Sequence, residues 1–503
     1  MTTSEKVIES AELAYEDSLN LFNVPTSNLG VTDVKFLKYK PINQFTSEGA
    51  VRFYVPGVGP SYIDLSGATL KTVVRILRSD GSPIPKRNKA GGSQPSTTTK
   101  RAASATDGTG ATISSTSEQT SSADKEDIHD ASTDSTDSTA SADTSEDEGI
   151  WSISTCNHLA QSLWDSIEIK MNDRVMTHGQ TRYSYMSMLN TLLCESKMNE
   201  SDLECSFFYK DTAGYLDDTS LSAAGGNEGL KKRAELLSES KPVELLAKIE
   251  VDVLKNSKKY LLNGVSLAIH LTPTDNKFRL LTCNGKTKDY KLVIEDISLI
   301  LPHVTPANHV LLAHQDVLKS ELSRAKYFYI KEELRSFNLA KGSSSYHLED
   351  AFNGRLPQKI LLAFVDGAAI AGSLSRNPYN FKHNFLSFIN ISESGNPSPR
   401  GAIYLDFERG EYLQSYKQLY EGKTCDALSS ARIKREDFPN GYSIFRIDLA
   451  PQDGKEFYPI NKQGCCRIEL RFDKPLAESV VMLAKVEYPG LYELDFSRNI
   501  FVS

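Results

Sequence analysis

Three histidines that could in principle bind a metal, His303, His309 and His314, lie close together in the chain. Metal-binding histidines usually lie four residues apart on a helix or at fixed strand spacings. The gaps here are six and five residues. We therefore interpret the three as polar side chains of a linker and predict no metal site.

Paired carboxylates are the second kind of candidate, because two acidic groups flanking a sugar bond can hydrolyse it. The visible doublets are Asp217-Asp218 and Glu332-Glu333. Adjacent residues of a strand point to opposite faces, so a doublet in sequence is poor support for two carboxylates sharing one site. We predict that both doublets are solvated surface charge.

Cys465-Cys466 is the one vicinal pair among the seven cysteines, and no CxxC spacing occurs. We expect reduced thiols of an intracellular protein, with one member of the pair buried and the other outward. The sequence also lacks GxxxxGK[ST], GxGxxG, HExxH and GxSxG motifs. We predict no catalytic residue, no cofactor and no enzymatic activity.

The segment 377–388 (NPYNFKHNFLSF) is rich in aromatic residues, including Tyr379, Phe381 and His383. A base-stacking platform would need interleaved Lys and Arg, but only Lys382 and His383 are present. Turn residues leading into a core strand are the favoured interpretation. The functional alternative is an interface loop, since aromatic side chains anchor protein–protein contacts.

Charge and hydropathy exclude several classes of function. The 503 residues carry 57 Lys and Arg against 65 Asp and Glu, a net charge of −8, so bulk charge does not indicate a nucleic-acid binder. No run approaches 18 apolar residues, which argues against a membrane-spanning helix. The N-terminal residues lack the basic and apolar regions of a secretory signal.

Residues 79–150 differ from the rest of the chain. No aromatic residue occurs between Tyr62 and Trp151, and 102–149 hold twelve acidic residues and one lysine, a net charge of −11. Such a segment cannot bury enough apolar surface to offset its ordering entropy. We predict a disordered or mobile acidic insertion within a domain, because folded sequence continues on both sides.

Elsewhere the dominant pattern is strand, with alternating or β-branched runs flanked by Gly, Pro, Asn or Asp. The predicted strands are 48–55, 68–77, 166–176, 244–253, 260–271, 290–301, 325–330, 359–365, 385–391, 442–449, 467–472 and 479–486. Helical spacing appears in 183–198 and 411–420. Strands this frequent predict an all-β fold of jelly-roll sandwiches.

The order of elements repeats. Each half has early strands, one helix-bearing excursion (180–241 and 393–440) and late strands. We therefore predict two jelly rolls in tandem. The predicted division is an N-terminal arm (1–29), a first jelly roll (30–305) that contains the acidic insert, a linker (306–323) and a second jelly roll (324–503).

Several segments resemble the major capsid proteins of Maverick/Polinton elements and their adintovirus relatives. The resemblance covers nearly all of 30–503 apart from the insert, and its motifs are distinctive in combination, although none is catalytic. They are 208–218 (FYKDTAGYLDD), 261–271 (LLNGVSLAIHL), 377–383 (NPYNFKH), 406–416 (DFERGEYLQSY) and 492–500 (YELDFSRNI).

The resemblance implies a double jelly-roll subunit that forms pseudo-hexagonal homotrimers, which tile an icosahedral shell around double-stranded DNA. It implies a virion protein that assembles in the nucleus or cytoplasm, with itself and a penton or minor capsid protein as partners. It implies no sequence-specific binding of nucleic acid and leaves a membrane open. The candidate interface residues are Tyr379, Phe381, His383, Tyr412 and Tyr416.

Two other hypotheses stay open. A double jelly roll could instead bind or process glycans, in which case paired carboxylates should line an aromatic cleft. A host-retained capsid copy with a new role is a third possibility that sequence alone does not separate from the first.

Overall fold

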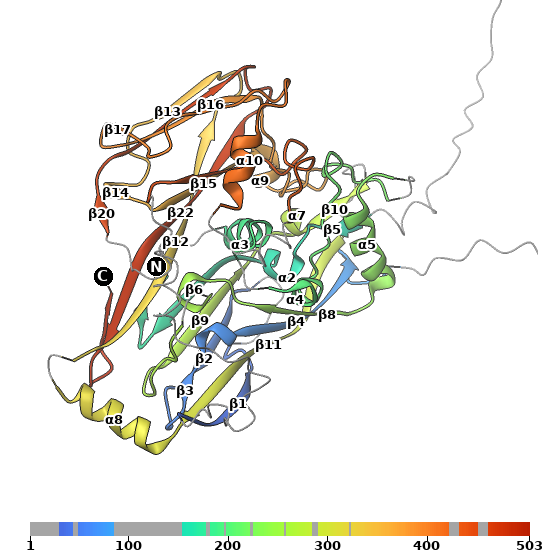
Figure 1. Ribbon diagram of the computed structural model, residues 1–503. Coiled ribbons are helices and arrows are strands. Elements are labelled where there is room, and N and C mark those ends of the chain that lie inside the picture. Colours follow the sequence, from blue (N-terminus) through green and yellow to red (C-terminus); the bar gives the residue numbers. More distant parts are fainter. Residues whose placement is uncertain are drawn as a thin grey trace, which may run out of the picture.

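The computed structural model describes residues 30–43, 49–84, 153–177, 182–195, 198–221, 225–255, 258–283, 290–320, 323–421, 432–450 and 461–502. The predicted N-terminal arm and all but the first residues of the acidic insert lie outside these ranges. Within them, long strands form two β-rich bodies, and short helices lie mainly between and around them (Figure 1).

The first sandwich is built from two antiparallel sheets. One has the strand order β1-β11-β4-β8 with β3 beside β11, and the other has the order β2-β9-β6-β7. The strands are β1 (Val31–Tyr39), β2 (Val51–Val55), β3 (Tyr62–Ile63), β4 (Thr69–Arg78), β6 (Trp164–Met171), β7 (Arg174–Val175), β8 (Val243–Lys248), β9 (Leu267–Pro273) and β11 (Tyr290–Pro306). A separate ribbon pairs β5 (Ile153–Thr155) with β10 (Leu280–Thr282).

The second sandwich has the same construction. Its sheets have the orders β12-β22-β15-β19, with β23 beside β22, and β13-β21-β16-β17, with β18 beside β16. The strands are β12 (Ala325–Leu339), β13 (Ser345–Leu348), β15 (Lys359–Asp366), β16 (Leu386–Glu393), β17 (Asn396–Pro397), β18 (Ile403–Tyr404), β19 (Ile444–Asp448), β21 (Cys466–Phe472), β22 (Val480–Leu494) and β23 (Ile500–Val502), and a ribbon pairs β14 (Arg355–Leu356) with β20 (Lys462–Gln463).

The two sandwiches share one topology. If the main strands are numbered within each half, the sheet orders are 1-8-3-6 and 2-7-4-5 in both halves. This is the pairing of a jelly roll, in which the first strand lies beside the last. The predicted fold class, two jelly rolls in tandem, is confirmed.

Strand formation follows from alternation of apolar side chains. In β4 every second residue is buried, including Leu70, Val74 and Ile76, while the residues between them are half-buried. In β2 the buried residues are Val51, Phe53 and Val55. Side chains of a strand alternate between its faces, so both strands send one apolar row into the core between the sheets.

The helices are short, and several lie in the predicted excursions. α3, α4 and α5 lie within 180–241, and α10 lies within 393–440. The helices are α2 (Leu159–Ser162), α3 (Tyr183–Leu192), α4 (Glu200–Cys205), α5 (Glu228–Leu236), α6 (Asp252–Lys255), α7 (Asn276–Arg279), α8 (Asn308–Leu318), α9 (Gly367–Ile370) and α10 (Leu413–Leu419), with 3₁₀ turns η2 (Leu65–Gly67) and η3 (Ser238–Ser240).

Two predicted strands are shorter in the structure. The strand predicted over 244–253 ends at Lys248, and α6 begins at Asp252. The strand predicted over 260–271 begins only at Leu267, because Leu261 instead makes an isolated bridge to Ile63. The prediction of a polar linker with His303 was wrong in detail, because β11 continues to Pro306 and includes His303.

The cores of the two sandwiches interpenetrate. Tyr327, Tyr329 and Tyr492, on strands of the second sandwich, pack in the apolar core of the first. Conversely, Tyr185 and Leu189 of α3 pack in the core of the second. The 15-residue strands β12 and β22 pair along their whole length and extend from one core to the other. The two halves therefore pack as one body.

Candidate functional site

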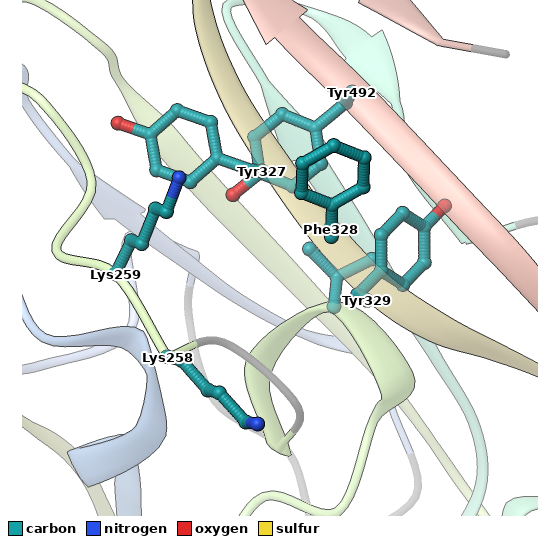
Figure 2. A pocket seen from close by; sticks show the side chains of 7 residues that line it. Lys258, Lys259, Tyr327, Phe328, Tyr329 and Tyr492 are labelled. Atoms are coloured by element: carbon teal, nitrogen blue, oxygen red, sulfur yellow. The ribbon is translucent and has the colours of Figure 1, made fainter. Parts of the chain in front are cut away.

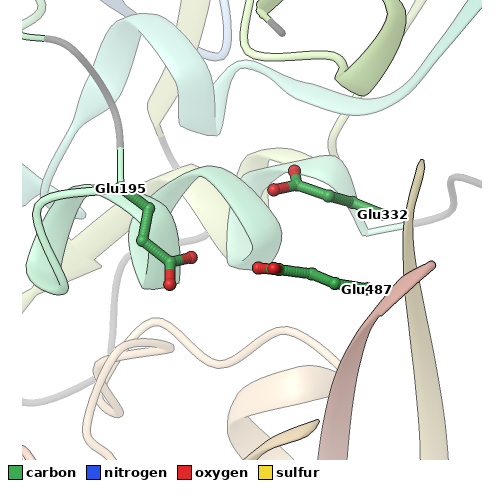
Figure 3. Close-up of side chains that lie close together, drawn as sticks. All are labelled: Glu195, Glu332 and Glu487. Atoms are coloured by element: carbon green, nitrogen blue, oxygen red, sulfur yellow. The ribbon is translucent and has the colours of Figure 1, made fainter. Parts of the chain in front are cut away.

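A buried network of charges lies where the two sandwiches meet. Glu195 follows α3 of the first sandwich, whereas Glu332 and Glu487 project from β12 and β22 of the second (Figure 3). Lys485 Nζ lies 2.7 Å from Glu195, 3.2 Å from Glu332 and 2.9 Å from Glu487. The Lys485 side chain is fully buried.

Two further lysines complete the network. Lys359 of β15 lies 2.9 Å from Glu195 and 3.0 Å from Glu487, and Lys255 of α6 lies 2.7 Å from Glu332. Three carboxylates therefore face three ammonium groups. Buried charges are tolerated when they are paired and hydrogen-bonded in this way. The network joins the two halves electrostatically.

The electrostatics of the network favour its charged form. Burial alone would raise the pKa of Glu332, but Lys255 and Lys485 outweigh it and lower that pKa to about 2. Burial alone would lower the pKa of Lys485, but the three carboxylates hold it well above its usual value. The neighbouring Asp252 has its pKa raised to about 7, by burial and by the Glu332 charge.

The ligand atoms of the three carboxylates lie within 4.8 Å of one another, which is close enough for a metal ion. The lysines already neutralise these carboxylates, and Lys485 contacts all three. A cation there would have to displace a fully buried ammonium group, so the donor set does not fit a metal. Its chemistry is that of a structural ion network.

The prediction that Glu332 is solvated surface charge was wrong. Its side chain is almost fully buried, whereas Glu333 faces the other side of β12 and pairs with Lys331. The sequence signal was available in β22, where Lys485 interrupts an apolar run (VVMLAKV). A lysine inside such a strand implies a buried carboxylate partner.

Asp217 of the other doublet is also structural. Its carboxylate accepts hydrogen bonds from the Asn377 backbone N–H (2.9 Å) and the Asn380 side chain (2.6 Å), and it lies 3.2 Å from Lys382. Asp218 accepts from the Ser220 N–H. Asp217 thus fixes the 377–382 turn against the first sandwich, and the two carboxylates do not share a site.

Two of the five candidate interface residues lie in the core. Tyr379 and Phe381 are 2% and 0% exposed. The Tyr379 ring packs edge-on against Tyr185 and Phe278 of the first sandwich, and its hydroxyl lies 2.5 Å from the Ser162 hydroxyl. Both residues therefore pack in the core of the folded chain, and their contact with another subunit stays a prediction.

The other three candidates are half-buried. His383 stacks on Phe407 with a ring-centroid distance of 4.0 Å, and Phe407 stacks on Tyr412. Burial lowers the pKa of His383 to about 4, so its ring is neutral at pH 7. Tyr416 packs edge-on against Phe438. Contact of this aromatic group with another subunit stays a prediction.

Exposed apolar side chains mark further surfaces. β1 is an edge strand whose Val34 and Phe36 are 46% and 71% exposed. α8 exposes Leu312 and Val317, and β18, which pairs with β16 of the second sandwich, exposes Tyr404. Exposed apolar side chains on an unpaired edge are typical of surfaces that contact another chain.

The histidines do not form a site. His303 lies in β11, where its ring accepts or donates a hydrogen bond with the Tyr39 hydroxyl (3.0 Å). His314 lies in α8 and contacts the Tyr62 hydroxyl at 2.9 Å. Both therefore pack against strands of the first sandwich rather than converging on a common point.

The vicinal cysteines divide as predicted, with Cys466 buried and Cys465 exposed. Burial raises the pKa of Cys466 to about 12, which disfavours the reactive thiolate. Among the described residues, no helix has the length and apolar character needed to cross a bilayer.

No protein-family model matches the chain. A Caenorhabditis elegans protein described as "Uncharacterized protein F54H12.2" is 24% identical over 360 residues, which are 69% of this chain and 81% of that protein.

Solved structures resemble the chain over nearly its whole length. A chain of the Sputnik virophage has a TM-score of 0.58 at 11% identity and covers 98% of this chain and 93% of its own. The Faustovirus major capsid protein has a TM-score of 0.52 at 8% identity, with coverages of 97% and 94%. A chain of the PBCV-1 virus capsid has a TM-score of 0.50 at 9% identity, with coverages of 96% and 99%. The chain thus has the double jelly-roll fold of viral major capsid proteins.

Proposed function

We propose that this protein is the major capsid subunit of a Maverick/Polinton-type virus or integrated element, and that it works by self-assembly rather than catalysis. The observation that carries the proposal is the repeated topology, two jelly rolls with the same strand order packed as one body. The structural neighbours that share this fold are capsid proteins.

The proposed assembly is a homotrimer with a pseudo-hexagonal outline. Three subunits contribute six similar sandwiches, which approximate a hexagon and can tile an icosahedral shell around double-stranded DNA. A threefold ring needs heterologous contacts, in which one side of a subunit meets a different side of its neighbour. The edge strand β1 and the exposed Tyr404 lie on different sandwiches and supply two distinct surfaces of that kind.

The Maverick/Polinton lineage rests on the motifs of the sequence. The relative in Caenorhabditis elegans fits an element carried in an animal genome. A host-retained copy with a new role stays the alternative within this class. The proposed location is the virion, after assembly in the nucleus or cytoplasm, and the proposed partners are further copies of the chain and a penton or minor capsid protein.

The proposed division of the chain places one jelly roll in 30–305 and the other in 324–503, with α8 inside the segment 306–323 that joins them. The acidic insert is proposed to project outward or laterally, because three copies of a −11 segment would repel packaged DNA. The described residues that flank it contact η3 and α5, since the Ile84 N–H donates to the Ser240 side chain and the Ser154 hydroxyl donates to Leu230 O.

The glycan hypothesis receives little support. A groove of about 590 Å³ on the second sandwich contains Glu349 and Glu469, with Arg467 beside them. Its described lining has no aromatic side chain, although sugar rings usually stack on one. The groove therefore lacks the aromatic cleft that glycan processing would require.

The decisive experiment is size-exclusion chromatography with light scattering on the full chain. The capsid proposal expects a species of three times 55.7 kDa, or larger particles. A protein that stays monomeric under a range of salt and concentration that favours assembly would contradict it.

A further inference from the structure

A small pocket lies where the second sandwich passes the segment 258–262 of the first. Its walls come from β12 and β22, and Lys258 and Lys259 lie at its side (Figure 2). The cavity measures about 150 Å³. That volume suits one large apolar or aromatic side chain.

The walls are aromatic. Tyr327 and Tyr492 stack with a ring-centroid distance of 4.7 Å, and Tyr329 packs edge-on against Tyr492. Phe328 is 43% exposed and lies 6.0 Å from Lys259 Nζ, measured to its ring centroid. The described lining contains two lysines and no acidic residue. The pocket therefore combines apolar walls with a local charge of +2.

One buried hydroxyl at the pocket lacks a partner. Tyr327 uses its hydroxyl fully, accepting from the Leu262 N–H and donating to Tyr260 O, both at 3.2 Å. Tyr492 is 1% exposed, and its hydroxyl has no hydrogen-bond partner among the described residues. Figure 2 shows this hydroxyl directed away from β22 into the group of pocket side chains. An occupant that shifts the neighbouring rings could supply the acceptor that this hydroxyl lacks within the protein.

We propose that this pocket binds the acidic N-terminal segment of the same chain, with Tyr15 in the cavity and its acidic neighbours on the two lysines. The sequence of 12–17 is Glu-Leu-Ala-Tyr-Glu-Asp, so one aromatic residue lies among three carboxylates. The whole of 1–29 has five acidic residues and one lysine. Its charge thus complements that of the pocket.

The connection to the described chain makes this binding sterically possible. The Gly30 carbonyl accepts a hydrogen bond from the Ala307 N–H, so the segment enters the fold beside the start of α8. The Tyr62 hydroxyl contacts His314 of α8, and Ile63 beside it bridges to Leu261 next to the pocket. Fifteen residues separate Tyr15 from Gly30 and span at most about 50 Å when extended. A tether of this length keeps the local concentration of the segment high.

The test is photo-crosslinking in the full chain, with Tyr15→p-benzoylphenylalanine as the probe and mass spectrometry as the readout. We expect crosslinks to peptides that contain Lys258, Lys259 and Phe328. The same probe at Tyr404, which is 74% exposed on the second sandwich, is the position control and should not label these peptides. Crosslinks from position 15 that lie only elsewhere would overturn the proposal.

Charge variants sharpen the test. Lys258→Glu with Lys259→Glu should lower the crosslink yield at least tenfold, and adding Glu16→Lys with Asp17→Lys should restore it. The matched control is Lys35→Glu with Lys38→Glu on β1, which should leave the yield unchanged. If the melting temperature shows that Lys258→Glu with Lys259→Glu destabilises the fold, the neutral variant Lys258→Gln with Lys259→Gln is used instead. A yield that ignores these changes would contradict the charge complementarity.

Two further measurements distinguish binding of the chain's own N-terminal segment from binding of any other group in the pocket. Tyr492→Phe keeps the ring and removes the hydroxyl, and should also lower the yield. In a mixture of isotopically light and heavy chains, crosslinks should join only like-labelled peptides, and mixed pairs would overturn binding within one copy. The crosslinking is measured on dilute subunits, so its outcome does not depend on whether the proposed capsid assembly is correct.

Discussion

Lys485 Nζ on β22 lies 2.7 Å from the carboxylate of Glu195, which follows α3 of the other sandwich. This contact joins residues 290 positions apart in the sequence. Because Lys485 also contacts Glu332 and Glu487, one fully buried ammonium group balances carboxylates from both halves of the molecule.

Removing that ammonium group should strongly destabilise the protein. Lys485→Met leaves buried carboxylates without their shared partner, a defect that typically costs about 3–5 kcal/mol. The free energy of unfolding in urea measures the effect. Lys319→Met, which breaks an exposed pair with Asp316 on α8, is the control and should cost less than about 1 kcal/mol. Equal losses for the two variants would contradict a structural role for the network.

The pH dependence of stability should reflect Glu332. Lys255 and Lys485 hold the pKa of this buried carboxyl well below its usual value of 4.5 in the folded protein. A lowered carboxylate pKa contributes stability above the unfolded pKa, and this contribution is lost as pH falls from 4.5 through the lower pKa of the folded state. Glu332→Gln should be less stable than the natural protein at pH 7, and the difference should shrink below pH 4.5 and nearly vanish at about pH 2. The free energy of unfolding in urea is measured for both proteins at pH 3, 5 and 7. A difference between them that is the same at all three pH values would contradict this prediction.

Tyr379 should act as a core residue. Tyr379→Ala removes a ring packed between Tyr185 and Phe278, so we expect a loss of about 3–5 kcal/mol in the free energy of unfolding. Tyr379→Phe keeps the ring but removes the hydroxyl, which contacts Ser162, and should cost about 1 kcal/mol. A Tyr379→Ala variant that unfolds normally but fails to assemble would show that this residue acts at an interface instead.

Phe36, unlike Tyr379, should affect self-association and leave the stability of the fold nearly unchanged. Its side chain is 71% exposed on the edge strand β1, so Phe36→Ser should leave the melting temperature nearly unchanged. Loss of one apolar anchor should weaken self-association about tenfold, measured by sedimentation. Val58→Ser, at an exposed residue of the 56–60 turn, is the control. If both variants assemble like the natural chain, β1 lies outside the contact surface.

The acidic insert offers a test on assembled particles. If the proposed outward placement is correct, protease should cleave within the 79–150 insert while particles stay intact, because packaged DNA would repel this acidic segment from the lumen. Cleavage is followed by gel electrophoresis, and disrupted particles serve as the reference. If the protease cleaves the insert only after the particles are disrupted, the insert lies inside the shell and the proposal is wrong.

Much of the fold could be predicted from local patterns. Alternation in β2 and β4 depends on neighbouring residues only, so it is visible in the sequence. Helix α8 was missed because Leu312 and Val317 face outward, and its apolar residues do not mark a buried face. The strand β1 was missed for the same reason, since most of its residues are exposed on both faces.

The ion network could not be predicted from neighbouring residues. Alternation indicated that only one of Glu332 and Glu333 could face the core, but the partners of Glu332 lie on α6 and β22. Whether a buried carboxylate is tolerated depends on those distant lysines. The folded topology, rather than the local pattern, decides its environment.

The interpenetration of the two cores has a mechanical consequence. With Tyr327 and Tyr492 seated in one core and Leu189 in the other, hinge motion between the halves would expose apolar surface and separate buried charges. Each molecule should behave as a stiff tile. In a closed shell, the bending needed for curvature would then fall on the seams between neighbouring molecules.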